Sequence, residues 1–129
     1  MKPETSKLPV HIRLNKSISS LMIAGTKMVP KCTEEFFDIN CNRVMAACAM
    51  GAATLAAQPE LINDPQKANT EACKLGQFLR QYTAKHPMQD LPVSASCPEL
   101  PVDDIIVSLN DDERWSRPRI AKWLKSIGL

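Results

Sequence analysis

The chain has 129 residues, a formal net charge of +2, 44% hydrophobic residues and 23% charged residues. This length and composition are typical of one globular domain, and they exclude disordered, fibrous and disulfide-dependent miniature proteins. The small net charge does not support binding of nucleic acid or anionic membranes through bulk charge. We therefore expect residues 1–129 to form one domain.

The cellular compartment is predicted from the N-terminal residues, the length of the longest apolar stretch and the number of cysteines. The first residues are polar and precede no long apolar stretch, so no secretory signal is expected. The longest apolar stretch, residues 44–57, is shorter than the roughly 20 residues that cross a bilayer. The five cysteines are then expected to be free thiols of a cytoplasmic protein that does not enter the membrane.

The N-terminal part is predicted to be an arm followed by a helix. Residues 1–13 contain two prolines and no helical period, which indicates an extended arm. From Leu14 the apolar residues recur with the 3.6-residue period of a helix, which Pro30 ends. Gly25 lies within the apolar stripe of this helix. It indicates either the close approach of another helix or a glycine that is merely tolerated.

The next predicted helix runs from about Asn40 or Asn42 to Gln58. Its body, residues 44–57, is rich in alanine and has almost no polar face. A helix that is apolar on all sides is usually buried on all sides. We therefore expect this helix at the centre of the domain, with neighbouring helices packed closely against its small side chains.

The C-terminal half is predicted to contain three more helices. Helical periodicity covers residues 65–85, and a proline-rich connector at 86–101 follows, either as a strap over the core or as a functional loop. Residues 102–109 predict a short helix, and Ser116 is placed to cap a final helix. No strand-like alternation extends beyond residues 10–14. The predicted fold is all-α, a compact bundle of four to five helices around the alanine-rich helix.

Catalytic and metal motifs are not found in the sequence. No cysteine or histidine pair has zinc-finger spacing, and neither a Walker A motif nor a G-x-S-x-G motif is present. We therefore expect no metal and no cofactor. A thiol- or metal-dependent enzyme remains a third alternative, with Cys32 as the thiol and His11 or His86 as the base.

The densest local chemistry lies near the C-terminus, where an acidic block is followed by a basic one. This segment contains both tryptophans, and tryptophan and arginine dominate binding hot spots. The predicted interaction surface, for another protein or for a second copy of the chain, consists of Arg114, Trp115, Arg117, Arg119 and Lys122. Alternatively, Trp115 only pins the turn before the last helix.

A nucleic-acid accessory protein is the second alternative. The helix that starts at Ser116, with Ile120 and Leu124 on its inner face, looks like the first half of a helix-turn-helix. No recognition helix follows in the sequence, which argues against major-groove reading. The remaining signal is a basic face with Arg119, Lys122 and Lys125, whose three charges would bind phosphate weakly.

Two stretches carry a resemblance to other proteins. The pattern Leu109-Asn110-Asp111, Trp115-Ser116-Arg117, Ile120-Ala121 and Trp123-Leu124, together with the run Cys48-Ala49-Met50-Gly51-Ala52-Ala53, resembles small uncharacterised bacterial or phage-type proteins. The resemblance implies one compact domain and no particular activity. Because catalysts usually leave a motif and binding surfaces need none, the sequence favours a non-enzymatic protein-interaction or regulatory module.

Overall fold

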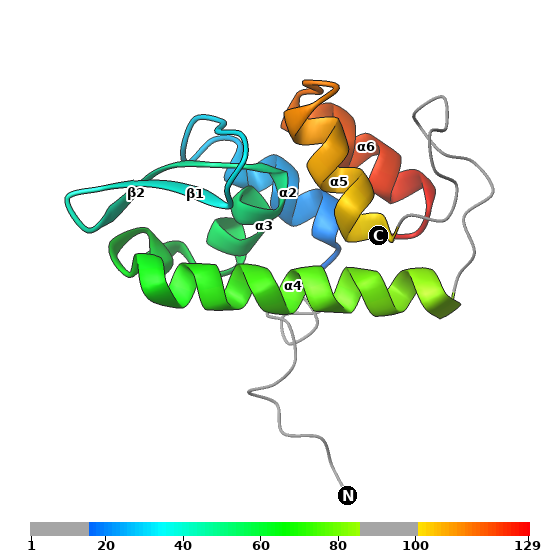
Figure 1. Ribbon diagram of the computed structural model, residues 1–129, viewed down its shortest axis with the longest axis horizontal. Helices are drawn as coiled ribbons and strands as arrows, with labels where there is room; N and C mark the ends of the chain where they lie inside the picture. Colours follow the sequence, from blue (N-terminus) through cyan, green and yellow to red (C-terminus); the bar gives the residue numbers. More distant parts are fainter. Residues whose placement is uncertain (1–15, 86–100) are drawn as a thin grey trace, which may run out of the picture.

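The computed structural model describes residues 16–85 and 101–129 (Figure 1). These ranges contain five α-helices, one 3₁₀ helix and a two-stranded antiparallel sheet. The elements run in the order α2 (Ile18–Gly25), β1 (Phe37–Asn40), β2 (Arg43–Ala47), α3 (Ala49–Ala57), η2 (Pro59–Asn63), α4 (Pro65–Lys85), α5 (Val102–Asp111) and α6 (Arg117–Ser126).

The predicted all-α class is wrong, because the mostly helical fold contains a small sheet. Strands β1 and β2 form a hairpin in which Asn40 pairs with Arg43. The two residues between them, Cys41 and Asn42, have φ angles of 51° and 58°. Positive φ at both central positions is what a type I′ turn requires, and this turn suits the twist of a two-residue hairpin.

The predicted central helix was therefore too long at its N-terminal end. Residues 43–47 belong to β2, where exposed and buried side chains alternate before two consecutive buried residues. The helix begins only at Ala49, after Cys48 as the N-cap, whose Sγ accepts a hydrogen bond from the backbone N–H of Gly51 at 3.4 Å. Alanine and methionine suit helices and conceal this short strand inside an apolar run.

The remaining part of the alanine-rich segment is buried as its composition predicts. Every residue of α3 from Ala49 to Leu55 is buried. A Cβ atom on Gly25 of α2 would lie 2.0 Å from the carbonyl oxygen of Ala52 in α3. The prediction that Gly25 permits a close helix approach is thereby confirmed.

The C-terminal helices follow their sequence signals. Helices α4 and α5 occupy the predicted segments, and the Ser116 side chain caps α6 by accepting a hydrogen bond from the N–H of Arg119. No helix in the described part of the chain is long and apolar enough to cross a membrane. The predicted arm, 1–13, lies outside the described residues, as does the connector 86–101 except for Pro101.

Helix α4 is the long element along one side of the molecule, and the hairpin, α3 and α5 lie above it in Figure 1. The larger apolar core joins side chains of α2, α3, α4, α5 and α6. A smaller core lies under the hairpin and joins it to α3, η2 and α4. The first residues of α3 therefore lie at the junction of these two cores.

Candidate functional site

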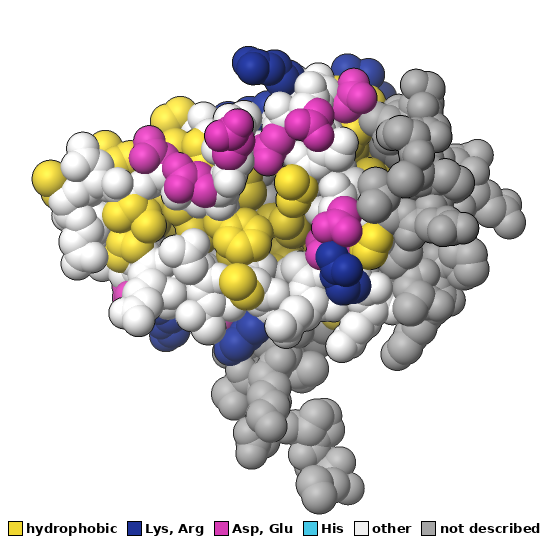
Figure 2. Space-filling view, viewed as in Figure 1, with side chains coloured by type: hydrophobic (Ala, Val, Ile, Leu, Met, Phe, Trp, Pro, Cys, Tyr) yellow, Lys and Arg dark blue, Asp and Glu magenta, His cyan; other side chains and the backbone are white. Residues whose placement is uncertain are grey.

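A hollow opens between α4, α5 and the start of α3. In Figure 2 hydrophobic side chains gather there, between the surface of α4 and a row of acidic side chains. The hollow has a volume of about 370 Å³, and its apolar wall consists of Phe36, Cys48, Met50, Ile106 and Val107. A pocket of this size suits one or two apolar side chains of a ligand.

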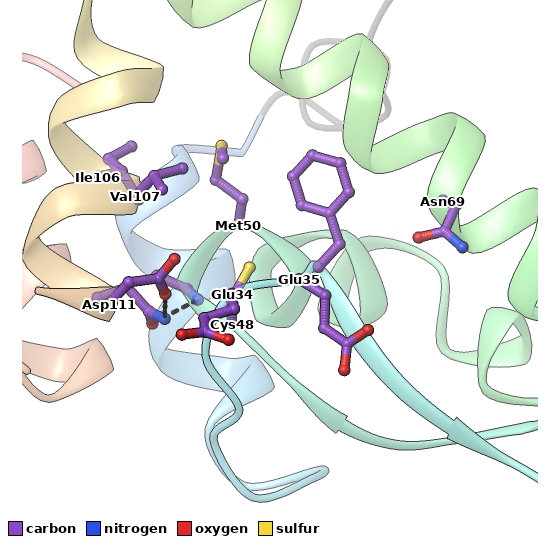
Figure 3. Close-up of a pocket in the computed structure, with 11 residues that line it drawn as sticks. Glu34, Glu35, Cys48, Met50, Asn69, Ile106, Val107 and Asp111 are labelled. Carbon is purple, nitrogen blue, oxygen red and sulfur yellow. Dashed lines mark hydrogen bonds between the residues drawn. The ribbon is translucent and has the colours of Figure 1, made fainter.

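The apolar residues reach this hollow from α5, from α3 with its N-cap, and from the segment before β1 (Figure 3). Ile106 and Val107 project from α5, while Met50 stands at the beginning of α3. Met50 and Ile106 are buried and form the floor, whereas Val107 is 42% exposed. Phe36, from the segment before β1, also lines the hollow and is half-buried. An apolar side chain that entered the hollow would therefore meet both a fixed floor and accessible apolar walls.

The hollow continues along α4 into a second one, which also has a volume of about 370 Å³. The two hollows share Phe36, Met50 and Val107. The second is bounded on α4 by Gly76 and Arg80. We call the two hollows together the α4–α5 groove.

Carboxylates line the rim of the α4–α5 groove at both ends. Glu34, Glu35 and Asp111 line one end, and Asp103 and Asp104 line the other. Arg80 donates hydrogen bonds to both Asp103 and Asp104 at 3.1 Å. Among the described lining residues, five carboxylates thus face one guanidinium, although the whole chain carries a formal charge of +2.

At one end of the groove, the side chain of Asn110 forms hydrogen bonds with three residues. Its Oδ1 accepts a hydrogen bond from the backbone N–H of Ala49 at 3.1 Å, and its Nδ2 donates to the carbonyl of Cys32 at 3.0 Å. The first bond satisfies a backbone donor that the first turn of a helix leaves without an intrahelical partner. Nδ2 also donates to Oδ1 of Asp111 at 2.7 Å, which orients this carboxylate at the rim.

No packing contact in the described part of the chain explains why a glycine, and not a larger residue, stands at position 76 in the groove. A Cβ atom added there would meet no atom within 4 Å among the described residues, although Gly76 lies in the interior of α4. Glycine within a helix costs about 1 kcal/mol relative to alanine. The missing side chain keeps this wall of the groove open.

The Cys48 thiol at the groove lacks the lowered pKa that is typical of a nucleophilic cysteine. Burial raises the pKa of Cys48 to about 11, and burial also raises the pKa of Cys32. A nucleophilic cysteine needs the opposite shift, towards the thiolate. Within residues 16–85 and 101–129, no group of three or more histidine, cysteine, aspartate or glutamate side chains is placed to hold a metal ion. The lining offers apolar side chains together with carboxylate and amide groups.

The predicted C-terminal surface is only partly assembled. Trp115 is half-buried, and the guanidinium of Arg119 stacks on its ring with Cζ 3.7 Å from the centroid. Arg114 and Lys122 are exposed, and Lys122 lines a different hollow between α2 and α6. The structure therefore brings Trp115 and Arg119 into contact and places Lys122 along another opening.

Arg117, predicted to be part of that surface, lies inside the molecule with 7% of its area exposed. Its guanidinium donates to the carbonyls of Val29 at 2.8 Å and Ala47 at 3.3 Å. Burial lowers the pKa of Arg117. Arg117 thus ties the start of α6 to the segment after α2 and to β2, and a partner cannot reach it as a hot spot.

Sequence reasoning missed most residues of the groove. Phe36, Glu34 and Glu35 lie in an irregular segment without helical or strand periodicity, so no local pattern singles them out. Asp103 and Asp104 stand in the first turn of α5, where acidic residues are common for the helix dipole alone. The signal that could have indicated a groove was Gly76, a glycine in the middle of a long predicted helix.

No protein-family model, curated protein or solved structure matches the chain. The resemblance carried by residues 48–53 and 109–124 stays a prediction.

Proposed function

We propose that the protein is a non-enzymatic interaction module that binds a segment of a partner protein in the α4–α5 groove. One observation carries this proposal. An apolar hollow of about 370 Å³ is open to solvent above the buried side chains of Met50 and Ile106. Apolar concavities with a few polar groups at their edge are the usual places where ligands and partner side chains bind.

The chemistry of the lining supports binding over the two alternatives. The raised pKa of Cys48 keeps its thiol protonated at neutral pH, which disfavours a thiol enzyme at this site. Carboxylates at both ends of the groove repel phosphate, which disfavours nucleic acid there. The proposal includes a cytoplasmic location, because the four described cysteines are free thiols, as a reducing compartment favours.

A substitution that fills the groove tests the proposal. Gly76→Leu places a side chain into open space on the groove wall, so that the fold is kept while the entrance is narrowed. Peptides selected from a random display library on the wild-type protein should bind the Gly76→Leu variant at least about tenfold more weakly, the loss expected when apolar anchors are displaced.

The control substitution is Lys122→Ala, which changes an exposed residue that lines the other hollow. This variant should bind the selected peptides as the wild type does. Peptides that bind Gly76→Leu and the wild type equally, and that lose affinity for Lys122→Ala, would transfer the interaction to α6 and contradict the proposal.

A further inference from the structure

We infer that the segment bound in the α4–α5 groove is basic and amphipathic, with apolar side chains for the hollow and lysine or arginine at both ends. This inference rests on the proposed function and names the class of partner. The apolar part of the inference follows from the floor and walls, which Met50, Ile106 and Val107 form. The basic part follows from the charge of the rim.

The rim of the groove is acidic, whereas the net charge of the whole chain is positive. The described lining residues include five carboxylates and one guanidinium, in a chain whose formal charge is +2. The guanidinium of Arg80 is already engaged by Asp103 and Asp104. At the other end Lys31 interacts electrostatically with Asp111, and its Nζ donates to the carbonyl of Trp115 at 2.9 Å. Glu34 and Glu35 are exposed at that end.

The carboxylates also set a spacing for the partner. Asp104 and Asp111 lie seven residues apart on α5, which is two helical turns or about 10.5 Å along the axis. Val107 lies between them and is 42% exposed. A helical partner with basic residues seven positions apart, and apolar residues three or four positions after the first, would place its charges and its apolar face in the same register.

Gly76 adds an observation that does not depend on charge. The groove wall at this position has no side chain, and a Cβ atom there would meet nothing within 4 Å in the described part of the chain. A bulky apolar residue of the partner can therefore approach the backbone of α4. Helix-in-groove complexes bury the apolar anchor residues of one helix face in such a groove.

The rim charges are expected to contribute more to partner specificity than to binding affinity. The carboxylates lie at the rim, where ion pairs contribute little individually and are screened by salt. Complementary rim charges mainly raise the association rate and reject partners of the wrong sign. A basic partner should thus be distinguished from an acidic one most strongly at low ionic strength.

Three synthetic helical peptides test the inference with the full chain. They share the same apolar residues and differ only in the two flanking positions, which are lysine, glutamine or glutamate. Binding is measured by fluorescence anisotropy at low and moderate salt. The lysine peptide should bind about tenfold more tightly than the glutamate peptide at low salt, and the ratio should fall as salt rises. Glu35→Gln combined with Asp111→Asn should reduce this ratio.

The outcomes separate the inference from the proposed function. Equal binding of all three peptides, abolished by Gly76→Leu, would overturn the basic partner and leave the groove as a binding site. Binding that Gly76→Leu does not weaken, or no binding by any peptide, would overturn both. A dimer of the wild type in sedimentation experiments, lost in Gly76→Leu, would make a second copy the occupant and also overturn the inference.

Discussion

Two glycines in different helices should respond to the same substitution with opposite signs. At Gly25 an added Cβ would lie 2.0 Å from the carbonyl oxygen of Ala52 and 2.8 Å from its Cα. At Gly76 it would meet no atom within 4 Å among the described residues. Neither glycine has a positive φ, so alanine fits both backbones and only the surrounding space differs.

The expected magnitudes follow from this difference. At Gly76, alanine relieves the cost of a helical glycine and should raise the free energy of unfolding by about 0.5–1 kcal/mol. At Gly25 the obstructing atoms belong to the backbone of α3, so two helices must move apart. Overpacking of this kind costs about 1–3 kcal/mol or more, and a gain in helix propensity of at most about 1 kcal/mol offsets it. Because backbone atoms cannot yield as a flexible side chain can, the cost lies near the upper end of this range, and we expect Gly25→Ala to lower the free energy of unfolding by about 2 kcal/mol.

Urea denaturation followed by circular dichroism at 222 nm measures both changes, provided that the slopes of the transitions are equal. The Gly76→Ala midpoint should lie above that of the wild type, and the Gly25→Ala midpoint well below it. A Gly25→Ala protein as stable as the wild type would show that α2 and α3 do not approach closely, and would refute the packing on which the groove floor depends.

Four further substitutions, one of them a control, probe the interior and the C-terminal segment. Arg117→Met should lower the free energy of unfolding by about 2–3 kcal/mol in urea titrations, because two backbone carbonyls lose their donor, whereas Arg119→Met should change it by less than about 1 kcal/mol. Because burial raises the Cys48 pKa from 9.0 to about 11, the stability held by its neutral thiol is present below pH 9 and lost as pH rises towards 11. The wild type should lose about 2–3 kcal/mol more than Cys48→Ala over this interval, and an equal loss would contradict the burial of the thiol. Trp115→Ala should lower the melting temperature by several degrees, since the ring packs against the main core, and should leave peptide binding in the groove unchanged.

Local signals in the sequence were sufficient for much of the helical part of the fold. The cap at Ser116 and the period of residues 65–85 reflect short-range requirements that the local sequence reveals. Gly25 was informative because it interrupts an apolar helical stripe, although the contact that requires it comes from α3. The hairpin was missed because a two-residue turn at Cys41 and Asn42 lacks the usual glycine, and because β2 merges into an alanine-rich helix.

The candidate site was harder to predict because it is made by distant segments. Phe36, Met50, Gly76 and Val107 come from four parts of the chain, and only the packing of α3, α4 and α5 brings them to one groove. Arg117 shows the converse error. Its residue type favours a binding surface, yet two carbonyls within the fold take up its donors. Sequence patterns report local periodicity, whereas a groove depends on tertiary contacts.

Amide chemical-shift mapping locates the surface of the protein that a bound peptide contacts. A ¹⁵N-labelled full chain is titrated with the lysine-flanked peptide, and the perturbed amides are located. If the peptide binds in the α4–α5 groove, the shift changes concentrate at Gly76, Val107 and Asp111, and the amides of Arg119 and Lys122 on α6 remain unchanged. Shifts confined to α6, with Gly76 and Val107 unaffected, would contradict binding in the groove.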